Sequence, residues 1–232
     1  MQNFYNTVAL LPMKANSERV KGKNFKNFCG KPLFRWVLDT LLNDHRIEKV
    51  IINTDARKIL AEHGIEDTEK IIIRDRPQKI CGDYVSMNEI IADDVANINS
   101  DVYLMTHTTN PLLSLKSLKS ALTLYNESSR FGFDSVFTVN KIQNRFYDKD
   151  CNAINHDPNN LIRTQDLTPW YEENSNLYIF SKDSFSQTKS RIGKKPKMMI
   201  TEPFESTDID TPSDWELAEI LVNYYRKKRL IK

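Results

Sequence analysis

The chain of 232 residues has few cysteines, no long apolar run and almost no excess of charge of either sign. Its three cysteines, Cys29, Cys81 and Cys151, are odd in number and widely spaced, which fits neither a disulfide framework nor a zinc ribbon and favours a reducing compartment. No apolar stretch approaches membrane-spanning length, and the first residues lack the apolar core of a signal peptide. We therefore expect a cytoplasmic protein with no membrane partner.

Charge is nearly balanced, with 33 Lys and Arg against 31 Asp and Glu. Such a chain has little general attraction for nucleic acid, so no nucleic-acid partner is expected and any phosphate binding must be local. The sequence also has no internal repeat, which excludes a solenoid. No serine or cysteine lies in a nucleophile motif such as G-x-S-x-G, so covalent catalysis has little support.

A concentrated cationic segment follows the first apolar run of the chain. Between Met13 and Asn24, four side chains are basic: Lys14, Arg19, Lys21 and Lys23. Small residues between them allow the backbone to approach a polyphosphate. Taken alone, a basic loop after a strand is more often a solvated turn than a phosphate-binding loop. Other features of the chain are therefore needed to choose between these two interpretations.

Short apolar runs alternate with segments of helical spacing along most of the chain. The apolar runs are Val8–Leu11, Val50–Ile52, Ile71–Ile73, Val102–Met105, Val136–Val139 and Asn176–Phe180. The helical segments are Leu33–Leu42, Ala56–His63, Val85–Ile98, Leu115–Tyr125 and Pro212–Tyr225. This alternation predicts βαβ crossovers, and hence a single Rossmann-like α/β domain over residues 1–232 with a mostly parallel central sheet flanked by helices. Ligands bind such sheets outside the carboxyl ends of the strands, where the basic loop would lie.

The pattern changes between residues 140 and 173 to a polar, aromatic and Asn-rich sequence without helical period. We interpret this segment as an extended excursion from the core. Its aromatic residues either pack a β-hairpin, the slightly favoured interpretation, or form a flap that contacts a second subunit or covers substrate.

Two carboxylates, Asp208 and Asp210, lie two residues apart before the last predicted helix. In an extended segment they point to the same side and can share one hard cation such as Mg²⁺. Alone, this spacing is typical of a solvated strand edge or a helix N-cap. The basic loop elsewhere in the chain makes the metal interpretation coherent, because Mg²⁺ commonly bridges carboxylates to phosphates.

Other polar side chains follow the predicted strands. Asp55 could contact a ligand, although capping the helix that begins at Ala56 is the favoured interpretation. Arg76 either contacts phosphate or pairs with Asp75. His107 lies in a polar cluster after the fourth strand, where it could hydrogen-bond a base or a sugar, although a lone histidine is more often structural.

Taken in order, these elements resemble the acylneuraminate cytidylyltransferase family, the CMP-sialic acid synthetases and their relatives that activate other 2-keto sugar acids. The resemblance spans nearly the whole chain, and its most specific part is the segment from Pro12 to Asn24 followed by Gly30-Lys31-Pro32-Leu33. The further similar elements are Asn53-Thr54-Asp55, Arg76-Pro77, Asp83 with Ser86, Arg163-Thr164-Gln165, Asn174 to Ile179, and Ser206 to Thr211.

The resemblance implies Mg²⁺-dependent transfer of CMP from CTP to the anomeric hydroxyl of a 2-keto-3-deoxy sugar acid, a nonulosonate such as a sialic, legionaminic or pseudaminic acid, with release of pyrophosphate. The residues it implies for catalysis are Lys14, Lys23 and Asp210. Those for the nucleotide are Leu11, Lys14, Ser17, Lys23, Asn24, Arg76 and Ser86. Those for the sugar acid are His107, Arg163, Gln165, Asn174 and Tyr178. Asp208 and Asp210 would hold Mg²⁺, and a homodimer is expected in which residues 140–173 reach into the neighbour.

Four positions depart from the family pattern: Lys14 for arginine, His107 for glutamine, Leu113 for arginine and Asn176 for a small residue. Lysine keeps the charge but loses the bidentate fork, while histidine changes the shape of the hydrogen-bonding group. We therefore expect a non-standard sugar acid. Two alternatives stay open: a nucleotidyltransferase with another acceptor or NTP, and a non-catalytic nucleotide-sugar binder.

Overall fold

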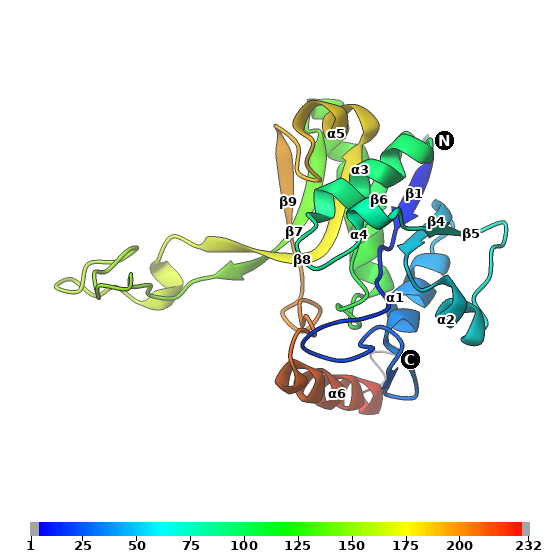
Figure 1. Cartoon of the computed structure of the whole chain (residues 1–232). Coiled ribbons are helices and arrows are strands. Elements are labelled where there is room, and N and C mark those ends of the chain that lie inside the picture. The colour runs from blue at the N-terminus through cyan, green and yellow to red at the C-terminus, as the bar shows by residue number, and fades with distance from the viewer. Residues whose placement is uncertain (1–4, 229–232) are drawn as a thin grey trace.

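The computed structural model describes residues 5–228, which form a seven-stranded mixed sheet with helices on both faces (Figure 1). The strands of the large sheet are β1 (Thr7–Leu10), β4 (Ile47–Thr54), β5 (Ile71–Asp75), β6 (Val102–Met105), β7 (Ser135–Ile142), β8 (Trp170–Ser181) and β9 (Pro196–Ile200). The helices are α1 (Leu33–Leu42), α2 (Arg57–Glu62), α3 (Met87–Asn97), α4 (Leu115–Ser128), α5 (Lys182–Thr188) and α6 (Pro212–Lys227). A small hairpin joins β2 (Asn27–Phe28) to β3 (Lys31–Pro32), and short 3₁₀ turns are η1 (Gln78–Ile80), η2 (Ser129–Phe131) and η3 (Thr164–Asp166).

The sheet has the strand order β5-β4-β1-β6-β8-β7-β9. Strands β5, β4, β1 and β6 pair in parallel, and so do β7 and β9. Strand β8 pairs antiparallel with both of its neighbours because the chain folds back on β7 to form it. The predicted α/β class with a mostly parallel sheet is confirmed, with β8 as the antiparallel member.

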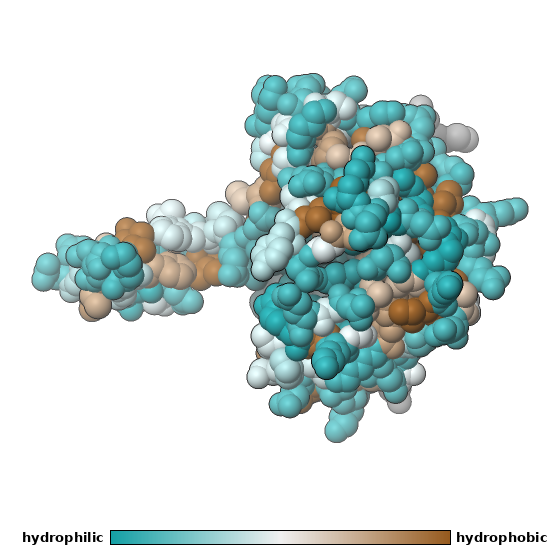
Figure 2. Space-filling model, viewed as in Figure 1, coloured by the Kyte–Doolittle hydropathy of each residue, from teal (hydrophilic) through white to brown (hydrophobic). Residues whose placement is uncertain are grey.

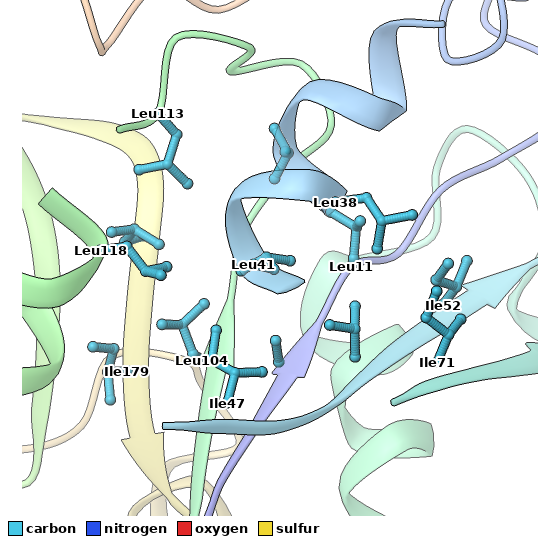
Figure 3. Close-up of a cluster of buried hydrophobic side chains, with 14 of the residues drawn as sticks. Leu11, Leu38, Leu41, Ile47, Ile52, Ile71, Leu104, Leu113, Leu118 and Ile179 are labelled. Carbon is cyan, nitrogen blue, oxygen red and sulfur yellow. The ribbon is translucent and has the colours of Figure 1, made fainter. Parts of the chain in front are cut away.

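The side chains on the two faces of β1 pack in two different hydrophobic clusters, because side chains alternate along a strand. Ala9 packs in the same cluster as Leu38 of α1 and Leu118 of α4, the cluster that Figure 3 shows. Val8 packs on the opposite side, with Ile91 of α3. Each fully buried valine, leucine or isoleucine side chain of these clusters stabilises the fold by about 1.5–3 kcal/mol. Burial on both faces explains why the predicted core strands read as continuous apolar runs.

A third apolar cluster joins α6 to the loop after β1, which runs close to that helix in Figure 1. Val20 of this loop is buried with Trp215 of α6 and with Phe28, whose ring lies 5.1 Å from that of Trp215. Thr211 caps α6 in a capping box with Asp214. This packing holds the loop against the body of the molecule.

Residues 140–173 form a long arm that leaves the body of the molecule between β7 and β8 (Figure 1). The arm begins and ends as an antiparallel ribbon, in which Asn140 pairs with Glu172. The rings of Phe146 and Trp170 stack at 5.2 Å, so aromatic residues pack within the ribbon as the hairpin interpretation expects. Within residues 5–228, no helix is long and apolar enough to cross a membrane.

Candidate active site

A cavity of about 310 Å³ opens at the carboxyl ends of β1, β5 and β6. The loops after these strands converge there with the segment that precedes α6. The structure brings the following predicted site residues together in its wall: Lys14, Ser17, Lys23, Asn24, Arg76, His107 and Asp210. This is the edge of the sheet at which a parallel α/β fold binds ligands.

Hydrogen bonds fix the basic loop over the sheet. Asn24 Nδ2 donates to the carbonyl oxygen of Lys14 at 2.8 Å, and Asn24 Oδ1 accepts from Thr108 Oγ1 at 2.7 Å. Asp55 Oδ1 accepts from the backbone N–H of Ala15 at 2.7 Å. The expectation that Asp55 caps α2 is wrong, because Ala56 occupies the N-cap position of that helix without any side-chain capping bond. Asp55 instead anchors the basic loop.

The basic side chains of this loop form ion pairs with carboxylates at the rim of the cavity. Lys14 pairs with Asp83, and Arg19 Nη2 lies 3.1 Å from Asp210 Oδ2. Lys23 is only 8% exposed, and its Nζ donates both to the carbonyl of Ile209 and to Asp210 Oδ1, the latter at 3.1 Å. Ion pairs at the surface contribute at most about 1 kcal/mol, so a phosphate can replace the carboxylates of the exposed pairs at little cost.

Arg76 presents a partly buried guanidinium to the same cavity. Its Nε donates to Asn53 Oδ1 at 2.9 Å, and its Nη2 donates to the carbonyl oxygen of Met13 at 3.1 Å. The expected alternative, a pair with Asp75, does not form, because Asp75 bonds Arg57 at 2.8 Å. Burial lowers the pKa of Arg76 from its ordinary value, as expected for a cation with neutral hydrogen-bond partners. An anion in the cavity would compensate this charge.

The carboxylates of Asp208 and Asp210 are close enough for the charge of one to act on the other. Burial raises the pKa of Asp208, the charge of Asp210 raises it further, and a hydrogen bond with Thr109 opposes the shift. Asp208 Oδ1 is buried without a hydrogen-bond partner. An orphaned carboxylate oxygen beside a second carboxylate fits a hard divalent cation. Residues 5–228 contain no group of three or more His, Cys, Asp or Glu suited to a metal, so phosphate and water would complete the coordination.

His107 connects the cavity to an arginine that the sequence analysis missed. Its Nε2 lies 3.4 Å from Arg191 Nη1. Burial, followed by the charge of Arg191, lowers the pKa of His107 to about 3, so the imidazole is neutral at pH 7. Arg191 lies between α5 and β9 in a segment without a motif, and only its position in the folded chain connects it with the site.

Other residues assigned to the nucleotide lie outside the wall of the cavity. Leu11 is fully buried in the core. Ser86 is the N-cap of α3, and its Oγ accepts from the N–H of Asn88 at 3.3 Å. Two positions that depart from the family pattern, Leu113 and Asn176, are also buried.

The remaining residues assigned to the sugar acid are divided between the arm and β8. Arg163 pairs with Asp166 at 2.7 Å on the arm, and Gln165 lies beside it in η3. Asn174 is buried in β8 and donates to Thr201 Oγ1 at 2.7 Å. Tyr178 is fully buried beneath Arg191.

The fold and this cavity define an α/β protein with a cavity lined by basic side chains at the carboxyl ends of its strands. The chain belongs to the cytidylyltransferase family, whose model matches residues 8–231. The predicted family resemblance is therefore confirmed, and the chain is a member of an enzyme family of nucleotidyltransferases.

Two bacterial relatives align with almost the full length of the chain. Pseudaminic acid cytidylyltransferase from Campylobacter jejuni subsp. jejuni serotype O:2 is 25% identical over 228 residues, which cover 92% of this chain and 95% of the relative. CMP-N,N'-diacetyllegionaminic acid synthase from Legionella pneumophila subsp. pneumophila is 25% identical over 230 residues, which cover 93% of this chain and 95% of the relative.

The fold is similar to a solved structure of CMP:2-keto-3-deoxy-manno-octonic acid synthetase complexed with CTP. The two chains superpose with a TM-score of 0.66 at 15% sequence identity, and the alignment covers 94% of this chain and 98% of the other. At this level of identity the likeness concerns the fold.

Proposed function

We propose that this chain transfers CMP from CTP to the anomeric hydroxyl of a nonulosonate-type sugar acid and releases pyrophosphate. The observation that carries the proposal is the cavity in which the cationic loop faces Asp210. The names of the Campylobacter and Legionella relatives, which specify pseudaminic and diacetyllegionaminic acids, support a nine-carbon sugar acid as the acceptor class.

In the proposed reaction, an oxygen of the acceptor forms a bond to the α-phosphorus of CTP, and the bond from this phosphorus to the bridging oxygen of pyrophosphate breaks. The acceptor hydroxyl loses its proton to solvent, and pyrophosphate leaves with the electron pair of the broken bond. Lys14, Lys23 and Arg76 bind phosphate oxygens, while Ser17 and Asn24 keep the loop close to the nucleotide. Catalysis then depends on positioning and on stabilisation of charge that develops on the phosphates.

Asp208 and Asp210 would hold Mg²⁺. When bound, the ion supplies positive charge that stabilises the phosphate oxygens of the transition state. The orphaned oxygen of Asp208 supports this assignment, and Asp210 would exchange part of its present pairing with Arg19 for the ion.

The proposed active form is a homodimer in which each arm reaches the neighbouring subunit. Arg163 and Gln165 lie on the arm, where they could serve the cavity of a partner but line no part of their own. Apolar side chains on the arm, among them Leu161 (61% exposed) and Ile162 (47% exposed), interrupt its hydrophilic surface (Figure 2). Contact with a second copy would cover them.

Pyrophosphate release from CTP and a panel of nonulosonates tests the proposal through the Asp210→Asn variant. This change keeps the shape of the side chain and removes the charge proposed to hold Mg²⁺, so we expect turnover to fall by at least about 100-fold. Asp101→Asn, an exposed aspartate outside the cavity, is the matched control and should keep wild-type turnover. Full turnover of Asp210→Asn would contradict the metal assignment.

A further inference from the structure

Arg191 is held rigidly from three sides although no motif marks it. Its guanidinium lies 3.9 Å from the centre of the Tyr178 ring, and its Nη2 lies 3.2 Å from Glu173 Oε1. Its backbone N–H donates to Asn88 Oδ1 at 3.3 Å, which ties the segment to the start of α3. The side chain is only 19% exposed. A guanidinium fixed in this way loses little conformational entropy when it binds a ligand.

The Nη1 edge of the guanidinium lies against His107, a residue of the cavity wall, although Arg191 itself does not line the cavity. Nη1 of Arg191 lies 3.4 Å from Nε2 of His107, which is part of the cavity wall. A guanidinium can only donate, so Nε2 accepts and the neutral ring carries its proton on Nδ1. His107 therefore adds no charge there, and the Nη1 edge of Arg191 is left with a neutral partner.

The distribution of cations around the cavity indicates which ligand group Arg191 would bind. On the nucleotide side, the cations Lys14, Arg19 and Lys23 are matched with carboxylates and are suited to a triphosphate. A sugar acid brings one more negative charge, beyond those of the triphosphate that these three cations would bind. Arg191 enters from a separate part of the chain, between α5 and β9, and brings a further cation, itself paired with Glu173, beside His107.

We infer that Arg191 binds the carboxylate of the acceptor and thereby selects sugar acids over neutral sugars. This inference rests on the proposed function and adds a residue to it that the sequence analysis did not assign. The planar guanidinium matches a carboxylate in shape, and such charge-assisted hydrogen bonds are among the stronger ones in proteins.

The same geometry gives Tyr178 a positioning role. One face of its ring is covered by Arg191, and its hydroxyl group bonds Glu173 and, at 3.3 Å, Ser175 Oγ. Tyr178 therefore acts on the acceptor through the orientation of Arg191.

The test combines a substitution in the enzyme with a change in the substrate. Pyrophosphate release is measured with an accepted sugar acid and with its C1 carboxamide, for the wild type and for Arg191→Gln. We expect the wild type to prefer the acid by at least about 30-fold in kcat/KM, and Arg191→Gln to reduce this preference to within about threefold with the KM for CTP unchanged. A preference that survives in Arg191→Gln would overturn the inference and leave the proposed function intact.

Two further variants separate this role from a structural one. Lys195→Gln removes an exposed charge from the same segment and should keep the wild-type preference. Arg191→Lys keeps the charge but loses the planar fork, so an intermediate preference is expected. If Arg191→Gln fails to fold by circular dichroism, the lysine variant decides: an unchanged preference for the acid over the amide overturns the inference.

A second measurement does not need turnover. If the wild type releases no pyrophosphate with any acid, the proposed function fails, and N-acetylneuraminate is then titrated into the wild type with Mg²⁺ and CTP while the ring resonances of His107 are followed by NMR. Arg191 binding predicts a saturable shift with the acid that is absent with its amide and absent in Arg191→Gln. No shift in the wild type, or an equal shift in Arg191→Gln, overturns the inference.

Discussion

Asn53 joins Arg76 to α3 through both ends of its side-chain amide. Asn53 Oδ1 accepts from Arg76 Nε at 2.9 Å, and Asn53 Nδ2 donates to Asp94 Oδ1 at 2.8 Å. Because the amide nitrogen has to face the carboxylate, the amide oxygen has to face the guanidinium. Arg74 pairs with the same carboxylate from β5 and holds it in place. A buried polar layer beneath the cavity thus orients the arginine in its wall.

Replacing Asn53 by alanine should weaken nucleotide binding without any direct contact between Asn53 and the nucleotide. The change removes the bond that orients Arg76 and leaves Asp94 with one partner fewer, which corresponds to about 1–2 kcal/mol, or a loss of CTP affinity of about 5–30-fold. Calorimetric titration with CTP and Mg²⁺ measures it. Asn43→Ala, an exposed asparagine at the end of α1, is the control. Equal CTP affinity in wild type and Asn53→Ala would rule out the orienting role.

The anchor of the basic loop can be tested separately at Asp55. Asp55→Ala removes the acceptor for the N–H of Ala15, and we expect the KM for CTP to rise by about 3–10-fold because the loop loses its fixed position. Asp55→Asn keeps an oxygen at this place and should stay within about twofold of the wild type. Steady-state kinetics with varied CTP give both values. If both variants raise the KM equally, the charge of Asp55 matters more than its hydrogen bond.

His107 should remain neutral well below the usual histidine range. Its pKa is lowered from 6.5 to about 3, first by burial and then by Arg191. The unfolded chain therefore binds more protons than the folded chain between these values, and the contribution of His107 to the free energy of unfolding is present above about pH 6.5 and declines as pH falls toward 3. NMR titration should show no protonation of His107 between about pH 5 and 8. A midpoint near 6.5 would contradict the burial of His107 beside Arg191.

The arm should determine the oligomeric state. We expect a dimer in sedimentation equilibrium and a shift to monomer when the exposed apolar residues Leu161 and Ile162 are both changed to aspartate. The matched control is Leu217→Asp, because Leu217 is 51% exposed on α6 and lies outside the arm. A wild type that stays monomeric at high protein concentration would remove the basis for a shared active site.

Local sequence patterns located the elements that have a full apolar face. Helix α1 begins and ends where its spacing predicts, because six of its ten residues are buried. Helix α5 and strand β9 were missed. In α5 only Ser184 and Phe185 are buried, and β9 is an edge strand without a fully buried residue, so neither shows an apolar period.

The residues of the site likewise include some that the sequence reveals and others that only the fold brings together. The basic loop is contiguous in the chain, so its charge was visible before its position was known. Arg191 contacts His107, which lies 84 residues away in the sequence, and β8 holds the arginine in place through the ring of Tyr178 and the carboxylate of Glu173. Asp55 was misassigned because an acidic residue before a helix normally caps it. Here no side chain caps α2, and the Asp55 carboxylate instead accepts a hydrogen bond from Ala15 in the basic loop.

Cytidylyl transfer to a sugar acid can be measured as pyrophosphate release with Mg²⁺ and each of the four NTPs, against sialic, legionaminic, pseudaminic and 3-deoxy-octulosonic acids. We expect release with CTP and at least one nine-carbon acid, and loss of release when EDTA removes the metal. Release with another NTP in place of CTP, or CTP binding without release for every acid, would contradict the proposed function.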